Sequence, residues 1–216
     1  MKTAVIRAIE EYKLIAIIRG VPQDKLVSLA EALYAGGIRL LEVTYSADGS
    51  TSDTEIAENI RTLAQHFEGR MYIGAGTVLT PEQVALTKEA GGLFIISPNA
   101  NPLVIQATVA HGMVSIPGAL TPTEVCLAKD LGADFVKLFP VTCLGADYVK
   151  AIKAPLSHVR LLAVGGIDCT NMAPYLRAGV CGFGIGSSLT DKALIRNNDW
   201  PAITALAQRF TEAAHG

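Results

Sequence analysis

The chain is short of the features that mark several classes of protein. Its 216 residues include only four cysteines, which show neither CxxC spacing nor pairing with histidine, so nothing indicates a metal site or a secreted disulfide framework. The net charge is −2 without a run of like charges, which argues against nucleic acid or an anionic membrane surface as a partner. No uninterrupted apolar run is long enough to cross a bilayer. We expect a cytoplasmic protein whose reduced cysteines lie mostly in the core.

What the chain has is a regular recurrence of short apolar runs. Hydrophobic residues make up 50% of it. Each run ends in a polar or glycine-rich turn and is followed by a segment of helical periodicity. The eight runs are LIAIIRG from residue 14, LLEVTYS from 40, MYIGAGTV from 71, LFIISPN from 93, MVSIPGA from 113, DFVKLFP from 134, RLLAVGGI from 160 and GFGIGSSL from 182. Alternating strands and helices predict a parallel sheet with right-handed crossovers.

Eight strand–helix units are the number that closes a (β/α)₈ TIM barrel, an α/β fold, and this is the architecture we predict. The alternative is an open doubly wound sheet, but the first strand lacks the GxGxxG turn of that fold. The segments TPEQVALTKEAGG and TPTEVCLAKDLGA begin with Thr-Pro and end at glycine, which is typical of capped helices. We expect one domain over residues 1–216, with additional helices at about 1–12 and 200–214.

Polar side chains interrupt or follow several of the predicted strands. Lys137 stands among apolar neighbours in DFVKLFP, and Glu42 stands in the middle of LLEVTYS. The carboxyl ends of barrel strands form one mouth, so Arg19 and Thr77, at the ends of the first and third runs, should meet them there. A charge inside a sheet buried on both faces is costly unless it is paired or functional. The structural alternative is a Lys137–Glu42 ion pair, or a lysine that reaches water at the rim.

Chemistry provides a function for a buried lysine. An amine whose pKa is lowered by apolar surroundings and a neighbouring cation is a nucleophile toward ketones. By strand alternation, Phe135 and Phe139 share the face of Lys137 and supply such surroundings. The iminium that forms withdraws electrons and lets the adjacent carbon–carbon bond break, while a carboxylate moves the protons. Glu42 is the only acid in the middle of a predicted strand, so we assign it that role.

Two glycine-rich turns follow the last two predicted strands. The first contains Gly165 and Gly166, and the second contains Gly184, Gly186 and Ser187. Backbone N–H groups after the seventh and eighth strands of a barrel often bind phosphate, so these turns predict an anion site. The alternative is that glycine only permits tight turns between strand and helix.

The motifs LEVT, GAGTVL, ISPN, IPGALTPTE, VKLFP, AVGGI and GIGSSL, in this order between Leu14 and Leu189, resemble those of the 2-keto-3-deoxy-6-phosphogluconate (KDPG) and 4-hydroxy-2-oxoglutarate (KHG) aldolases. That family consists of homotrimeric class I aldolases with a (β/α)₈ barrel and neither metal nor cofactor. The resemblance implies Lys137 as the Schiff-base residue and Glu42 as the general acid/base. It also implies a set of substrate-binding residues: Thr77, Pro98, Gly165, Gly166, Gly186 and Ser187. We add Arg19 and Phe139 to this set.

Two positions depart from the gluconate-type members of this family. Those enzymes usually carry a carboxylate-binding arginine two residues after the threonine of LEVT, where this chain has Ser46. They also tend to carry a threonine directly before the glycine pair, where this chain has Val164. The branch that acts on 2-keto-3-deoxy-6-phosphogalactonate (KDPGal) is similar at other points, including an arginine that contributes to anion binding and corresponds to Arg19.

We therefore predict a class I aldolase of carbohydrate metabolism, of the Entner–Doudoroff type, that cleaves a 2-keto-3-deoxy-6-phospho sugar acid to pyruvate and glyceraldehyde 3-phosphate. The small keto acid is the expected ligand, and no nucleic acid or membrane partner is expected. The alternatives are a KHG or KDPGal aldolase and a barrel that binds a phosphosugar or keto acid without turnover. Another phosphate-binding barrel enzyme, such as an epimerase or a synthase, would need residues that are not apparent.

Overall fold

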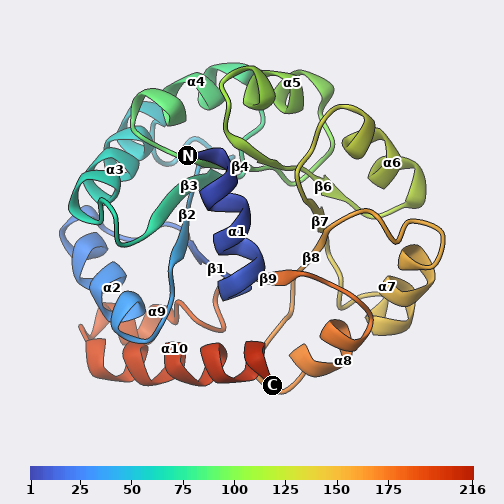
Figure 1. The fold of residues 1–216 in the computed structure, drawn as a ribbon. Coiled ribbons are helices and arrows are strands. Elements are labelled where there is room, and N and C mark those ends of the chain that lie inside the picture. The colour runs from blue at the N-terminus through green and yellow to red at the C-terminus, as the bar shows by residue number, and fades with distance from the viewer.

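The computed structural model describes residues 1–216 and shows parallel strands in a ring that helices surround (Figure 1). The strands are β1 (Leu14–Ile18), β2 (Leu40–Thr44), β3 (Tyr72–Gly76), β4 (Phe94–Ile96), β5 (Val114–Ile116), β6 (Gly118–Ala119), β7 (Val136–Leu138), β8 (Leu161–Val164) and β9 (Gly182–Ile185). The helices are α1 (Lys2–Tyr12), α2 (Gln23–Ala35), α3 (Asp53–His66), α4 (Pro81–Glu89), α5 (Pro102–Ala110), α6 (Pro122–Asp130), α7 (Gly145–Lys153), α8 (Met172–Arg177), α9 (Lys192–Arg196) and α10 (Trp200–His215).

The predicted (β/α)₈ barrel is confirmed, with one detail that the sequence left open. The nine strands are all parallel, in the order β5-β4-β3-β2-β1-β9-β8-β7-β6. β5 and β6 are the two parts of the single predicted run MVSIPGA, divided at Pro117, which has no N–H to donate. β5 pairs with β4 and β6 pairs with β7, so the ring closes through this one stretch of chain.

Two helices begin as the Thr-Pro signals predict. Thr80 accepts a hydrogen bond from the backbone N–H of Gln83 and caps α4. Thr121 caps α6 and forms a reciprocal capping box with Glu124, whose carboxylate accepts from the Thr121 backbone N–H. These caps fix where each loop of the barrel mouth turns into a helix.

The amino-terminal end of the barrel is closed by α1, which lies across the ring of strands (Figure 1). Val5, Ala8 and Ile9 of this helix are at most 4% exposed and form one cluster with inward-facing side chains of the strands, among them Phe94 and Phe135. A second and larger core fills the space between the strands and the outer helices. Helix α1 therefore closes the barrel interior at this end.

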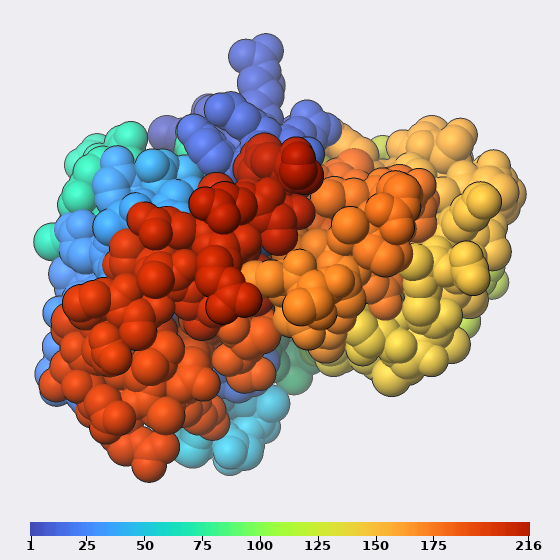
Figure 2. All heavy atoms as spheres, turned by 90° about the horizontal axis from the view of Figure 1, so that it is seen from below, coloured from blue at the N-terminus to red at the C-terminus, as the bar shows by residue number.

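The carboxyl-terminal helix α10 packs against α2, as the red and light-blue surfaces of Figure 2 show. Gly36, directly after α2, allows the close approach, because a Cβ at that position would overlap the side chain of Ala207. Thr211 Oγ1 donates to the Gly36 carbonyl at 3.0 Å. The last helix thus braces the helix that follows the first strand.

The expectation that the cysteines lie mostly in the core is wrong. Cys143 is exposed, and Cys126, Cys169 and Cys181 are half-buried, all of them as free thiols. Cys126 is on α6 and the other three are in loops, so none of them is in a strand that the core covers on both faces. Separately, none of the helices is long and apolar enough to span a membrane.

Candidate active site

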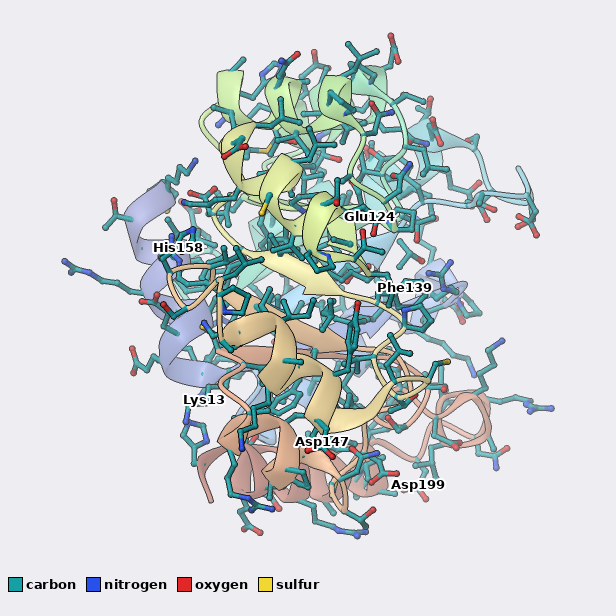
Figure 3. All side chains as sticks on the ribbon, turned by 90° about the vertical axis from the view of Figure 1, so that its right-hand side faces the viewer. Lys13, Glu124, Phe139, Asp147, His158 and Asp199 are labelled. Atoms are coloured by element: carbon teal, nitrogen blue, oxygen red, sulfur yellow. The ribbon has the colours of Figure 1, made fainter.

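The alternation of side chains along each strand decides which residues enter the ring. Beside and on β7, Phe135 belongs to the inner cluster, whereas Val136 and Leu138 belong to the outer core. Lys137 and Phe139 therefore share the inward face with Phe135. Figure 3 shows Phe139 at the end of the barrel away from α1, while Lys13 lies at the end that α1 closes.

A cavity of about 490 Å³ opens at this end of the barrel. All ten residues selected from the sequence line it: Lys137, Glu42, Arg19, Thr77, Pro98, Phe139, Gly165, Gly166, Gly186 and Ser187. Its size is that of a site for a small organic molecule. The structure therefore brings these residues together, while the role of each one stays a prediction.

Lys137 is buried in the wall of this cavity without a polar partner. Its side chain is 8% exposed, forms no hydrogen bond or ion pair within the protein, and has Nζ 4.6 Å from the centre of the Phe139 ring. Burial lowers the pKa of Lys137, and the Arg19 cation lowers it further, against an opposing effect of the Glu42 carboxylate. The result is an amine that gives up its proton more readily than an ordinary lysine.

Glu42 is the most deeply buried charged residue at the mouth, at 2% exposed. Its Oε2 atom has no hydrogen-bond partner. Burial raises the pKa of Glu42, and the nearby cations Lys137 and Arg19 oppose that rise. Room for the carboxyl group comes from Gly76, because a Cβ at that position would overlap the Glu42 carboxylate.

The structural alternative for the two charges, a Lys137–Glu42 ion pair, is not what the structure shows. The ion pairs within 4.0 Å are all elsewhere: Lys2–Asp134, Arg61–Glu58, His66–Glu31, Arg70–Glu31 and Arg160–Glu10. Lys137 and Glu42 influence each other's pKa across the cavity but form neither an ion pair nor a hydrogen bond with each other. An unsatisfied buried lysine and an unpartnered carboxylate oxygen facing one cavity are more typical of catalysis than of stability.

Arg19 and Thr77 form a polar rim on the same side of the cavity. An Nη2 hydrogen of Arg19 donates to Thr77 Oγ1 at 3.0 Å. Thr77 has φ +56°, a left-handed conformation that costs a non-glycine residue about 1–3 kcal/mol. The loop that holds it in place is tied down by Gln83, whose Oε1 accepts from the Leu79 N–H at 2.8 Å.

Gln83 also links this loop to the rest of the mouth. Its Nε2 donates to both carboxylate oxygens of Asp53 at 3.1 and 3.2 Å. Its backbone carbonyl accepts from Tyr45 Oη at 3.2 Å and from Thr87 Oγ1 at 2.8 Å. Gln83 does not touch the cavity, so it acts on the site only by positioning the Thr77 loop.

The other end of the cavity is made of the two glycine turns. Gly165 and Gly166 have φ +98° and +74°, and a Cβ on Gly166 would overlap the side chain of Thr142, so the fold itself requires glycine there. Gly186 is different, because it does not have a positive φ and a Cβ there would meet nothing within 4 Å. Its bare backbone faces open space beside the exposed Ser187. The alternative, that glycine only permits a tight turn, therefore explains Gly165 and Gly166 but not Gly186.

Besides Gly184 of the second glycine turn, the cavity wall contains five residues that were not selected from the sequence as substrate contacts: Ile17, Val164, Ile167, Asp168 and Ser188. Ile17 could have been found from its position two residues before Arg19 on the same strand face. Asp168 adds a carboxylate to the glycine end. Its Oδ1 accepts from the Thr170 hydroxyl at 2.6 Å and from the Thr170 N–H at 2.7 Å, which lowers the pKa of Asp168. No cation accompanies it, so the cationic residues of the cavity are Arg19 and Lys137 alone.

Ser46, the position where an arginine was expected by resemblance, lies outside this cavity. Its hydroxyl donates to Asp48 Oδ1 and is 2.8 Å from Ser50 Oγ. Asp48 Oδ1 also accepts from the Ser50 N–H at 3.1 Å, and the hydrogen bonds from Ser46 and Ser50 lower the pKa of Asp48 to about 2. A separate cavity of about 350 Å³, outside the first two strands, is lined by Ser46, Asp48, Ser50 and Arg19 among others. Arg19 is therefore the residue that remains for a carboxylate in the main cavity.

The arrangement can support amine chemistry on a carbonyl group. A lysine of lowered pKa can supply a nucleophile, and a carboxyl group of raised pKa can donate and accept protons. An arginine beside them can bind an anionic end of a reactant. The chain has no group of three or more His, Cys, Asp or Glu side chains placed to hold a metal ion.

Comparisons with known proteins agree with this geometry. The model of the family described as KDPG and KHG aldolase matches residues 5–206. The chain is 36% identical over 177 residues to the 2-dehydro-3-deoxy-6-phosphogalactonate aldolase of Escherichia coli (strain K12), covering 82% of this chain and 83% of that protein. It is 34% identical over 209 residues to the 2-dehydro-3-deoxy-phosphogluconate aldolase of Treponema pallidum (strain Nichols), covering 95% of each.

A solved structure shares the whole fold. The KDPG aldolase of Legionella pneumophila, crystallised with pyruvate captured as a covalent carbinolamine, superposes with a TM-score of 0.85 at 30% identity. The superposition covers 96% of this chain and 97% of that one. Covalent capture of pyruvate in that protein is the chemistry for which a buried amine is suited.

Proposed function

The chain belongs to the KDPG and KHG aldolase family, and from that premise we propose that it is a class I aldolase that uses Lys137 to cleave a 2-keto-3-deoxy-6-phospho sugar acid. The products are pyruvate and glyceraldehyde 3-phosphate. The observation that carries the proposal is the pair of buried groups in one cavity: a lysine of lowered pKa without a partner, and Glu42 with a free carboxylate oxygen.

The reaction begins with the neutral amine of Lys137. Its lone pair attacks C2 of the keto acid, and the carbonyl oxygen takes up a proton to give a carbinolamine. Glu42, in its protonated form, donates a proton to the departing hydroxyl group, so water leaves and an iminium forms. Burial raises the pKa of Glu42, which favours the protonated form that this step needs.

Bond cleavage uses the same two groups. The Glu42 carboxylate accepts the proton of the C4 hydroxyl group, the C3–C4 electron pair moves toward the iminium, and the aldehyde separates from an enamine. The enamine is then protonated at C3, and water hydrolyses the resulting iminium to release pyruvate and restore the amine.

The two ends of the substrate are bound by different groups. Arg19 and Thr77 hold the carboxylate, and Pro98 and Phe139 pack beside the three-carbon pyruvate part. The backbone N–H groups of the two glycine turns and the Ser187 hydroxyl hold the phosphate. The open space at Gly186 supports this assignment, because an anion can approach that backbone closely.

Borohydride trapping tests the mechanism. Incubation with pyruvate and borohydride should add a reduced pyruvate adduct to the protein, on the tryptic peptide that contains Lys137. An intact mass that stays unchanged after this treatment would overturn the proposal. That result, together with pyruvate-induced thermal stabilisation, would instead favour a barrel that binds keto acids without turnover.

Substrate identity is decided by a pyruvate-release assay on KDPG, KDPGal and KHG. The relative from Escherichia coli is a phosphogalactonate aldolase, and Arg19 supports the same preference here, because Ser46 offers no cation to the cavity. The expected order of kcat/KM is therefore KDPGal first, KDPG second and KHG, which lacks a phosphate, last. A preference for KDPG would place the enzyme in the Entner–Doudoroff route.

We also propose that the protein is a cytoplasmic homotrimer. Exposed apolar side chains on neighbouring helices support an interface between copies: Leu103 of α5 is 63% exposed, Val109 of α5 is 38% exposed and Leu127 of α6 is 42% exposed. Light scattering coupled to size exclusion should give a mass near three times 22.8 kDa. A monomeric mass would contradict the proposal.

A further inference from the structure

A second and smaller cavity adjoins the mouth of the barrel, between the loop after β1 and helix α9. It has a volume of about 130 Å³. Four of the eight residues that line it are cations and none is acidic: Arg19, Lys25, Lys192 and Arg196, with Val21, Pro22, Thr190 and Ile195. We name this cavity the basic pocket. In a chain of net charge −2, four cations around one small cavity are a local excess that needs an explanation.

None of these four cations is neutralised by an ion pair. The carboxylates in ion pairs are those of Asp134, Glu58, Glu31 and Glu10, all with other partners. Lys25 Nζ donates to the carbonyls of Ile195 and Arg196, at 3.2 and 2.8 Å, and so joins α2 to the end of α9. A third hydrogen on Nζ is left for another acceptor.

The backbone adds to this positive field. Helix α2 has 13 residues, and its first residue is preceded by Pro22, which lines the pocket and provides no side-chain cap for the first N–H groups. Uncapped N–H groups at a helix amino terminus attract anions. The nearby carboxylates are Asp24 and Asp191, and both lie outside the lining. Asp191 already accepts from the N–H groups of Ala193 and Leu194.

Arg19 connects the basic pocket with the active site, because it lines both cavities. One of its N–H groups donates to Thr77 in the active site, and a guanidinium has five N–H groups in total. A doubly charged oxyanion in the basic pocket would engage the remaining donors. It would then compete with the carboxylate of a keto acid for the same guanidinium.

We infer that the basic pocket is a binding site for a phosphate-type oxyanion, separate from the glycine turns, and that its occupancy weakens the binding of the keto-acid carboxylate through Arg19. Tetrahedral oxyanions match the pocket in size and in charge, since they accept several charge-assisted hydrogen bonds at once. The anion site itself does not depend on aldolase activity, whereas its effect on pyruvate rests on the proposed function.

Binding is tested with inorganic phosphate on the full-length protein, by thermal unfolding at constant ionic strength with chloride as the balancing anion. A double variant, Lys192→Gln with Arg196→Gln, removes two cations from the pocket without touching the active site. The matched control is Lys129→Gln with Arg177→Gln, two exposed cations that line neither cavity. We expect the phosphate affinity of the double variant to be roughly fivefold lower than that of the wild type, and that of the control to be unchanged.

The glycine turns also bind phosphate, so the difference between the variants is the informative quantity. Equal phosphate-dependent stabilisation of the wild type, the control and the double variant would overturn the inference. If the double variant has a lower melting temperature without phosphate, isothermal titration at 20 °C gives the same comparison on folded protein.

The consequence for catalysis is tested by pyruvate trapping with borohydride. Phosphate should raise the pyruvate concentration for half-maximal trapping severalfold in the wild type and the control, and much less in the double variant. The same phosphate effect in all three proteins would contradict the coupling through Arg19. Failure of trapping without phosphate would instead contradict the proposed function, and the unfolding experiment would still decide the anion site.

The source of the oxyanion is distinguished by kcat/KM without added phosphate. If the pocket holds the phosphate of the substrate, the double variant loses kcat/KM for the phosphorylated substrate alone. If it holds a separate anion, kcat/KM is unchanged in the double variant and only the sensitivity to phosphate is lost.

Discussion

The two ends of the active-site cavity present different chemical groups: side chains at one end and mainly backbone at the other. At the inner end are the side chains proposed to do the chemistry: burial shifts the pKa values of Lys137 and Glu42, and Arg19 lies beside them. At the outer end, the chain offers mainly backbone, through Gly165, Gly166 and Gly186. The first kind of site depends on how charges are desolvated, and the second on where side chains are absent. Substitutions should therefore act through different quantities at the two ends.

The largest effect is expected at the inner end, from Lys137→Met. Without the amine no imine forms, so kcat should fall by at least about 10,000-fold and borohydride should trap no adduct. The folded protein should not lose stability, because the variant replaces a buried amine of lowered pKa by an apolar side chain. Retention of the pyruvate adduct would show that another lysine carries the imine.

The stability of this variant has a defined pH dependence. Since burial lowers the pKa of Lys137, the unfolded chain binds more protons at this residue than the folded one, and wild-type stability gains from a rise in pH through that range. The Met variant lacks this contribution. Urea unfolding at neutral and alkaline pH should show that the advantage of the variant becomes smaller as the pH rises.

Glu42→Gln tests the proton transfers at the same end. The amide keeps the shape of the side chain but exchanges no proton, so kcat should fall by about 100- to 10,000-fold while KM changes little. Pyruvate trapping should slow but still reach completion with time. A kcat within a factor of three of the wild type would remove Glu42 from the mechanism.

At the outer end, Gly186→Ala and Gly166→Ala should differ from each other. A methyl group on Gly186 meets no protein atom, so stability should stay constant while kcat/KM for a phosphorylated substrate falls roughly 10- to 100-fold. Gly166 has φ +74° and Thr142 beside it, so its variant should lose about 1–3 kcal/mol of unfolding free energy. Thermal unfolding measures the stability of each variant. Assays on phosphorylated and non-phosphorylated substrates measure kcat/KM.

Two outcomes would contradict these predictions for the glycine variants. If Gly186→Ala lowers kcat/KM equally for phosphorylated and non-phosphorylated substrates, the outer end is not a phosphate site. If Gly166→Ala keeps full stability, its glycine is required by a ligand and not by the turn.

The smallest effect is expected from Arg19→Met. Loss of the charged hydrogen bond to the carboxylate should raise the KM for pyruvate about tenfold. The Arg19 cation lowers the pKa of Lys137, so its removal raises that pKa, and the acid limb of the pH–rate profile for imine formation should move to higher pH. A limb that moves to lower pH, or stays in place, would contradict the electrostatic role of Arg19.

The barrel and the inner end of the site could be predicted from the sequence, because both depend on patterns along single strands. A lysine in an apolar run and a glutamate in another are visible without a structure, as are the Thr-Pro helix starts. The alternation of a strand does not tell which layer of the barrel a residue occupies. Val164 therefore gives no sign from its strand alone that it lines the cavity.

Other features depend on contacts between distant segments. Thr44 shares a predicted strand face with Glu42, but its hydroxyl donates to the Ile18 carbonyl and it borders the cavity of Ser46 instead. Gln83 reads as a surface amide on a helix, and its role appears only when the Thr77 loop folds over it. The cations of the basic pocket lie as far apart as Arg19 and Arg196, so no local pattern could have joined them.

Helix α1 has a consequence for the order of events in the proposed reaction. Because it seals one end of the barrel, the substrate and both products use the same opening. The pyruvate fragment stays attached to Lys137 at the inner end, while the phosphorylated aldehyde lies nearer the opening of the barrel. Release must then be sequential, with the aldehyde leaving first and pyruvate second. In the direction of synthesis pyruvate must bind first, and the aldehyde should act as a competitive dead-end inhibitor of pyruvate at high concentration.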